Sequence, residues 1–264
     1  MEIFKETFFI HAIISGMLIA GLCSFLGVYI ILKRIVFIGL ALSEIAALGV
    51  AIGLFLGWQA EISAIVVTFS GVLFFWQWSK NQKIPNESII GAVYILAGAL
   101  SVILVSKNPS IEATGVDLIK GNILYTTKAD IRMLALLTVV TLPLHLLLLK
   151  ELLFVSFDRE TAHVTGLNTG LYEFVLYLSV GMVVALSMRV GGILFVFGSL
   201  IVPPLISLTL FRKINLVFLF SAIIAVGSVV AGVFISYFLD LPSTPAILCV
   251  YGLIFALANS VADT

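Results

Sequence analysis

Nine long apolar runs constrain the possible folds of this chain more than any other feature of its sequence. Each run is close to the roughly 17–25 residues that an α-helix needs to cross a lipid bilayer. Hydrophobic residues make up 61% of the 264 residues and charged residues only 11%, whereas soluble domains carry about 45–50% and roughly 25%. Lipid is therefore the natural solvent for this chain. The runs are residues 8–32, 36–57, 62–79, 88–106, 131–149, 171–188, 190–211, 214–238 and 245–261.

The runs predict an all-α polytopic membrane protein, a helical bundle of eight or nine transmembrane helices in one domain over residues 1–264. Helices are expected because a backbone in lipid must satisfy its own hydrogen bonds. The number depends on residues 187–192, which separate the sixth and seventh runs and end in Gly191-Gly192. A broken or re-entrant helix there would leave eight spans and place the C-terminus outside.

Lys and Arg predict which span ends face the cytoplasm, because short cytoplasmic loops are enriched in both. With the N-terminus outside, eight basic residues fall in cytoplasmic connections and two outside, when the long 107–130 connection is set aside. An external N-terminus is therefore favoured. The eight are Lys33, Arg34, Lys80, Lys83, Lys150, Arg159, Arg212 and Lys213, and the two are Lys5 and Arg189.

Small residues recur at the spacing of one helix face in the second run. Gly49, Gly53 and Gly57 follow one another at intervals of four, and such stripes let helix backbones approach closely. We expect them to pack helices within the chain, and a subunit interface is the alternative.

Several function classes lack support in the sequence. The formal net charge is zero, which argues against a nucleic-acid surface. Cys23 and Cys249 lie far apart inside apolar runs, without the spacing of a metal site. No G-x-x-x-x-G-K-[ST], H-E-x-x-H or G-x-S-x-G motif occurs. We therefore expect neither enzymatic activity nor a cofactor in this chain, and active transport would draw its energy from another subunit or an ion gradient.

Ionisable residues in apolar runs are functional candidates, because a charge in the bilayer core is costly. Glu173 and Arg189 lie near run ends, where we expect their side chains to reach the interface. Asp240 begins a Pro-rich turn, for which a turn or cap role is expected. His145 follows Pro143, and we expect it to offset the missing backbone donor or to bond a neighbouring helix.

Glu44 is the strongest of these candidates, because it lies well inside the second run and several turns from Arg34 and Glu61. A buried carboxylate needs a partner or a proton, and carboxylate oxygens suit hard divalent cations. Glu44 is therefore a candidate for a cation pathway. A hydrogen-bonded structural carboxyl is the alternative.

Two connections are too long for tight turns. In residues 150–170, Ser156 or Asp158 is placed to cap a short helix and Gly166 to end it. Such a helix would fit a groove on a cytoplasmic partner, or serve as an interfacial linker. Residues 107–130 are too polar for a full span, and a partly inserted hairpin near the pathway or an extracellular loop would fit them.

Ordered sequence pieces over almost the whole chain resemble the permeases of bacterial zinc/manganese/iron ABC importers. Each piece alone is weak, but their order and spacing are specific. The pieces are Gly27 to Gly39, Gly121-Asn122-Ile123-Leu124, Phe157-Asp158-Arg159-Glu160-Thr161-Ala162 with Gly166, Gly192 to Val196 with Leu200-Ile201-Val202-Pro203, and Ser236-Tyr237 with Asp240 and Pro242.

The resemblance implies a permease in the bacterial inner (cytoplasmic) membrane that does not itself bind ATP. Its implied partners are a second copy of the permease, two ATP-binding subunits and an extracytoplasmic metal-binding protein. The 150–170 connection would then couple the permease to the ATPase, and Pro203 would belong to the helix packing. The residues expected to couple are Phe157, Asp158, Glu160, Ala162 and Gly166.

The chain departs from the family pattern where the metal would bind. The family's Asp and His, four residues apart in the second span, correspond to Leu40 and Glu44, the Asp of its G-D-I-L piece is Asn122, and a usual Gly is Ser243. Glu44 and Asn122 are thus the pathway candidates, and losing an imidazole favours manganese or iron over zinc. The expected function is import of divalent metal ions (Zn, Mn or Fe), or of a metal chelate. The alternative is a gradient-driven carrier or channel that acts without an ATPase.

Overall fold

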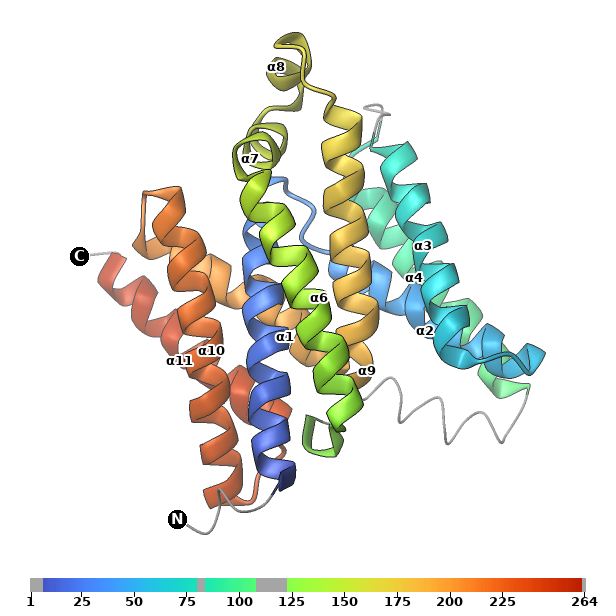
Figure 1. The fold of residues 1–264 in the computed structure, drawn as a ribbon, viewed down its shortest axis with the longest axis vertical. Helices are drawn as coiled ribbons and strands as arrows, with labels where there is room; N and C mark the ends of the chain where they lie inside the picture. The colour runs from blue at the N-terminus through green and yellow to red at the C-terminus, as the bar shows by residue number, and fades with distance from the viewer. Residues whose placement is uncertain (1–6, 80–83, 108–122, 263–264) are drawn as a thin grey trace. The chain divides into compact units, whose positions relative to one another are not determined.

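The computed structural model describes residues 7–79, 84–107 and 123–262, and among these it contains helices and no strands (Figure 1). Helices fit both the apolar composition and the need of a backbone in lipid to bond within its own segment. The elements are α1 (Thr7–Leu32), α2 (Ile38–Leu56), α3 (Ala60–Trp78), α4 (Asn86–Ser106), the 3₁₀ helix η2 (Ile123–Tyr125), α6 (Lys128–Leu147), α7 (Leu149–Phe157), α8 (Arg159–Val164), α9 (Thr169–Leu210), α10 (Ile214–Leu239) and α11 (Ser243–Ala262).

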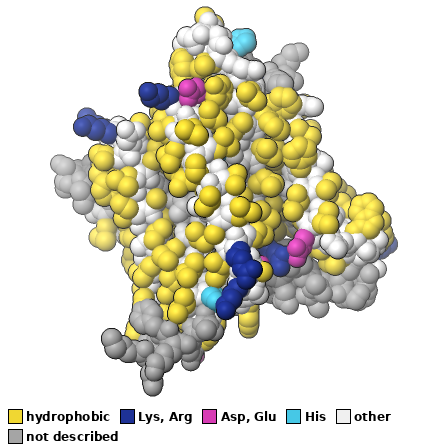
Figure 2. All heavy atoms as spheres, in the orientation of Figure 1, with side chains coloured by type: hydrophobic (Ala, Val, Ile, Leu, Met, Phe, Trp, Pro, Cys, Tyr) yellow, Lys and Arg dark blue, Asp and Glu magenta, His cyan; other side chains and the backbone are white. Residues whose placement is uncertain are grey.

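Eight helices in the described part of the chain are long and apolar enough to cross a membrane: α1, α2, α3, α4, α6, α9, α10 and α11. The predicted helical bundle is therefore confirmed. The count differs from the nine runs only at α9, whose 42 residues include both the sixth and the seventh run. Figure 2 shows the face of these helices covered mainly by hydrophobic side chains, with charged groups in a few places.

The predicted interruption in α9 is a break at one residue rather than a loop. Gly192 has φ 79° and ψ 163°, and only glycine adopts such a positive φ without strain. Before the break, α9 runs antiparallel to α3, because Trp76 Nε1 donates to the Gly170 carbonyl at 2.6 Å while Gly181 lies against Val72. The two apolar runs are thus two helical pieces that meet at Gly192.

The chain forms two compact units, each assembled from separated stretches. Unit 1 comprises residues 1–31, 121–142 and 187–264, and unit 2 comprises residues 32–120 and 143–186. The chain passes between the units inside α6 at Pro143 and inside α9 five residues before Gly192.

In unit 1, α9 and α10 pack on α1 and α11 packs on α10, and small residues allow these helices to approach closely. The part of α9 after the break lies parallel to α1, with Gly27 directly against the Leu200 carbonyl. α10 lies antiparallel to α1, where the Ser221 hydroxyl donates to the Ser24 carbonyl at 3.1 Å. α11 packs on α10 at Gly232. Buried hydroxyl bonds of this kind and small contact residues are the usual means of joining helices in lipid.

Unit 2 contains the glycine stripe of α2. Gly49 and Gly53 lie against α3, where a Cβ on Gly49 would be 2.7 Å from the Ala64 Cα. Gly57 has a different role, because it ends α2 with φ 71° and a Cβ there would meet nothing within 4 Å. Two of the three glycines therefore allow the α2–α3 contact, and the third allows the turn between them. Pro203, in unit 1, is buried inside α9.

Candidate functional site

The connection between α6 and α9 is almost entirely helical. The single residue Leu148 separates α6 from α7, and the single residue Asp158 separates α7 from α8. Asp158 has an extended backbone, so it ends one helix and begins the next. This is the element for which the sequence predicted a short capped helix, and α8 confirms that prediction.

Both ends of α8 are closed by local hydrogen bonds. The Asp158 carboxylate accepts from the Thr161 backbone N–H at 3.0 Å and from the Thr161 hydroxyl at 2.5 Å, and these two bonds lower the pKa of Asp158 below its usual value. At the other end Gly166 has φ 88°, and Leu167 N–H donates to the Ala162 carbonyl at 3.2 Å. Of the two predicted caps, Asp158 rather than Ser156 is therefore the N-cap, and Gly166 ends the helix as expected.

Apolar side chains are exposed on α8 and at the end of α7, next to the α8 N-cap. Phe157 is 63% exposed and Val164 is 86% exposed, whereas Ala162 is fully buried beneath the helix. Beside α8 there is an open hollow of about 460 Å³ that is lined by Arg159, His163 and residues 166–170. Asp158 and Glu160 are exposed as well. Of the five predicted coupling residues, Glu160 and Ala162 lie in α8. Phe157 is the last residue of α7, Asp158 caps α8 and Gly166 follows it. Whether they couple to an ATPase stays a prediction.

The base of α8 is joined to the long helices of unit 2 through Glu173. The Glu173 side chain is 1% exposed, and its Oε1 lies 2.6 Å from Lys33 Nζ and 3.1 Å from Arg159 Nε. The Ser79 hydroxyl donates to Oε2 at 3.2 Å. The expectation that Glu173 reaches the membrane interface is wrong, because two cations and a hydroxyl hold its carboxylate inside the protein.

Sequence reasoning missed this cluster, although one signal was present. Lys33, Ser79 and Glu173 lie at ends of apolar runs, and Arg159 lies in the connection 150–170. The distribution of Lys and Arg assigns all four to the cytoplasmic side. At the same end, the Val36 backbone N–H donates to the Glu87 carboxylate at 2.9 Å. An acidic residue among basic residues assigned to one side predicts an ion pair. The orientation itself stays a prediction.

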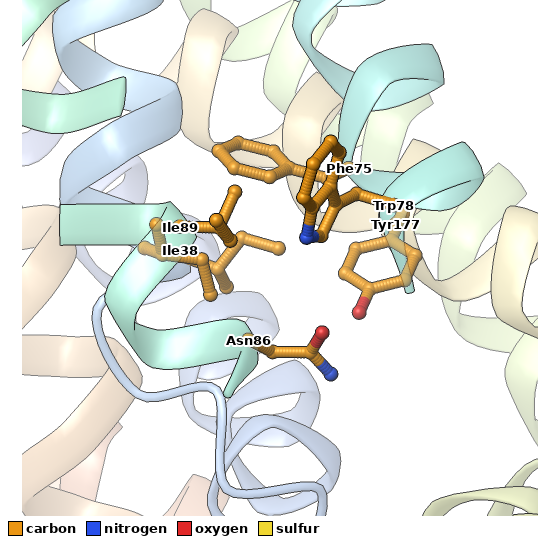
Figure 3. A pocket seen from close by; sticks show the side chains of 7 residues that line it. Ile38, Phe75, Trp78, Asn86, Ile89 and Tyr177 are labelled. Atoms are coloured by element: carbon orange, nitrogen blue, oxygen red, sulfur yellow. The ribbon is translucent and has the colours of Figure 1, made fainter. Parts of the chain in front are cut away.

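A small cavity of about 10 Å³, enough for one water molecule, is lined by residues of α2, α3, α4 and α9 in unit 2. Figure 3 shows Phe75 and Trp78 of α3 facing Ile38 of α2, with the Tyr177 hydroxyl pointing toward Asn86. In the described part of the chain, the buried Trp78 Nε1 has no hydrogen-bond partner.

Glu44 lies partly buried on α2 and faces α4, where its Oε2 would be 3.3 Å from a Cβ on Gly98. Its carboxylate forms no hydrogen bond or ion pair with any residue that the structure describes. Among those residues, no group of three or more His, Cys, Asp or Glu is close enough to hold a metal ion. Asn122, the second pathway candidate, lies outside the described residues, so a pathway through Glu44 and Asn122 stays a prediction.

The other ionisable candidates have local roles. Asp240 is the C-cap of α10 with φ 51°, which confirms the expected cap. Arg189 lies 3.7 Å from Asp130, whose carboxylate caps α6 by accepting from the Thr127 N–H at 3.0 Å. His145 is buried in α6, two residues after Pro143.

Comparison with known proteins matches residues 5–262 to the ABC 3 transport family. The chain is 26% identical to the manganese transport system membrane protein MntC of Halalkalibacterium halodurans, over 97% of this chain and 88% of that protein. It is 29% identical to a Haemophilus influenzae protein named "Probable iron transport system membrane protein", over 98% of this chain and 91% of that protein.

A solved structure has the same fold. The structure of PsaBC from Streptococcus pneumoniae in complex with Fab contains a chain that superimposes with a TM-score of 0.84. The two chains are 23% identical, and the match covers 97% of this chain and 92% of that one. Eight apolar helices and this likeness define a multi-pass helical membrane protein with the fold of that chain.

The family match extends over nearly the whole chain, and the chain therefore belongs to the ABC 3 transport family. The resemblance inferred from ordered sequence pieces is confirmed by this match. A gradient-driven carrier or channel is not favoured, because the chain belongs to an ABC transport family and its relatives are named as membrane proteins of transport systems.

Proposed function

We propose that this chain is the membrane-spanning permease of an ATP-binding-cassette importer for divalent metal ions, and that α8 is the element on which a separate ATPase acts. The permease holds the translocation pathway. The ATPase hydrolyses ATP and moves α8, and the two conformations of the permease open to opposite sides of the membrane.

The exposed surface of α8 is the observation that carries this proposal. Phe157 and Val164 are apolar side chains that are mostly exposed at the end of unit 2 that contains Lys33 and Arg159. The basic residues predict that this end is cytoplasmic, and beyond the span ends lipid does not cover an apolar side chain. A short helix with an apolar contact surface fits a groove on a partner protein. Closed caps at Asp158 and Gly166 support a rigid element that transmits displacement.

Two observations support a divalent metal ion as the cargo: the names of the relatives and the carboxylate of Glu44. The relatives above are named for manganese and iron transport. In unit 2 of this chain, Glu44 offers carboxylate oxygens on α2, and such oxygens suit hard divalent cations. Leu40, one turn before Glu44, offers no ligand atom. These two positions support manganese or iron over zinc as the cargo.

The same proposal names the partners and the location. The complex contains two copies of this permease, two ATPase subunits and an extracytoplasmic protein that delivers the metal, and it lies in the bacterial cytoplasmic membrane. Exposed apolar surface on α3, α4 and α6 is available to lipid and to the second copy.

Reconstitution tests the proposal. The permease is co-expressed with the ATPase encoded beside its gene, and uptake of Mn²⁺, Fe²⁺ and Zn²⁺ into proteoliposomes is measured with and without ATP. We expect uptake only with ATP and the ATPase. Uptake by the permease alone, driven by an ion gradient, would overturn the proposal in favour of a carrier.

A surface variant tests the role of α8. The double substitution Phe157→Ala with Val164→Ala removes the exposed apolar groups, and we expect it to weaken ATPase binding roughly tenfold or more. Tyr125→Ala is the control, because Tyr125 on η2 is also a largely exposed aromatic residue and lies outside α7 and α8. The fold of both variants should be preserved, since exposed side chains contribute little to stability. Wild-type ATPase binding by the double variant would contradict the role of α8.

A further inference from the structure

The Glu173 carboxylate connects four stretches of unit 2 that are distant in sequence. We propose that Glu173 is the positioning residue through which a displacement of α8 reaches the transmembrane helices. This inference rests on the proposed function, because it assumes that an ATPase moves α8. Beyond the proposed function, it names the residue that transmits the movement of α8.

Burial requires that the Glu173 carboxylate be fully paired. A buried charge without partners is strongly destabilising, and only 1% of this side chain is exposed. Oε1 lies 2.6 Å from Lys33 Nζ and 3.1 Å from Arg159 Nε, and Oε2 accepts a hydrogen bond from the Ser79 hydroxyl at 3.2 Å. Both oxygens are therefore engaged, and the carboxylate cannot leave one partner without a cost.

The partners come from distant parts of the sequence. Lys33 follows α1, Ser79 is the C-cap of α3, Arg159 is the first residue of α8, and Glu173 is in the second turn of α9. A second bond, from Trp76 Nε1 to the Gly170 carbonyl, fixes the beginning of α9 to α3. A rotation of α8 therefore pulls directly on the start of α9, rather than acting through a flexible loop.

The two ion pairs differ in a way that assigns them different roles. Lys33 is 8% exposed and makes a short hydrogen bond to Glu173. Arg159 is 26% exposed, and its Nε–H is not aligned for a hydrogen bond despite the 3.1 Å separation. Lys33 is thus the buried, hydrogen-bonded partner of Glu173, whereas Arg159 is the partly exposed partner that connects α8 to the carboxylate.

The experiment uses the complete complex of permease and ATPase in proteoliposomes. Glu173→Gln keeps the size of the side chain and removes its charge. We expect the complex to assemble and hydrolyse ATP, while metal ions imported per ATP hydrolysed fall roughly tenfold. Glu173→Asp retains a carboxylate and should recover part of this ratio. Glu151→Gln, which changes a carboxyl on α7 outside the cluster, should leave the ratio unchanged.

A spectroscopic measurement separates positioning from plain stability. A nitroxide on the exposed position His163 of α8, introduced as His163→Cys in a Cys249→Ser background, reports the mobility of α8. We expect its mobility to rise in Glu173→Gln and to return toward wild type in Glu173→Asp. Wild-type import per ATP together with wild-type mobility in Glu173→Gln would overturn the inference.

A second variant keeps the test decisive if Glu173→Gln does not fold. Arg159→Gln leaves the Lys33–Glu173 pair intact, so its thermal stability should stay near wild type while import per ATP falls. Normal import per ATP in Arg159→Gln would overturn the inference. Failure of the wild-type permease to bind any ATPase would instead overturn the proposed function, and the two failures are therefore distinguishable.

Discussion

Adding one methyl group at Gly27 will destabilise unit 1, because α1 and α9 approach most tightly at this residue among the described glycines. A Cβ built on Gly27 would lie 1.9 Å from the Leu200 carbonyl oxygen and 2.8 Å from Pro204 Cγ. The first of these atoms belongs to the backbone, so no side-chain rotation relieves the overlap. Gly27→Ala therefore forces the two helices apart.

The magnitude follows from two opposing effects. The distance from the Cβ to Leu200 must increase by about 1.5 Å to reach an ordinary contact of 3.4 Å. Overpacking of this kind costs about 3 kcal/mol when backbone must move. Alanine in place of glycine inside a helix increases the free energy of unfolding by about 1 kcal/mol. The expected net loss is about 2 kcal/mol, which lowers Tm by about 4–8 °C.

The assay is the fraction of purified permease that remains monodisperse after heating, measured by size-exclusion chromatography. Gly227→Ala is the matched control on α10 of the same unit, because a Cβ at Gly227 meets nothing within 4 Å. The control should be as stable as wild type or gain about 0.5–1 kcal/mol. If Gly27→Ala is as stable as Gly227→Ala, the close contact between α1 and α9 is not a source of stability and the reasoning is wrong.

Two further predictions concern unit 2. Hydrogen bonds from Thr161 lower the pKa of Asp158 from 3.8, so the cap of α8 is complete above pH 3.8 and is lost only as the pH falls through the lowered value. Amide hydrogen exchange of α8 should show this loss in wild type and not in Asp158→Asn, which caps without titrating. Trp76→Phe removes the bond to Gly170 and should cost about 1 kcal/mol more than Trp78→Phe, which removes a buried donor without a partner; equal Tm values would contradict this difference.

The fold was predictable because its determinants are local in sequence. Apolar length alone indicates a span, and the caps of α8 involve bonds between residues three to five apart, such as Thr161 to Asp158. Gly57 shows where local periodicity misleads. It continues the spacing of Gly49 and Gly53, but the Trp58 N–H bonds back to Gly53 and α2 ends there. A helix end depends on which backbone bond closes it, and a glycine stripe does not reveal that.

The candidate site was predictable only in part, because its central contacts are distant in sequence. Glu173 pairs with Lys33 across 140 residues and with Ser79 across 94. A position near a run end fits both an interfacial side chain and a buried ion pair, and only tertiary structure separates them. The same holds for the break at Gly192. The pair Gly191-Gly192 predicted an interruption, but the direction of each helical piece depends on the helices packed against it.

Under the proposals above, two carboxylates of unit 2 have separate tasks, with cargo binding at Glu44 and transmission of movement at Glu173. Glu173 has both oxygens engaged by cations and a hydroxyl, so a cargo ion would have to displace a paired cation from a buried position. Such displacement is strongly unfavourable. Glu44 has no partner among the described residues and faces Gly98, whose missing side chain leaves room beside the carboxylate. Under the proposed function, a metal ion would therefore bind at Glu44 rather than at Glu173, and substitutions at the two residues should separate the binding of cargo from the transmission of movement.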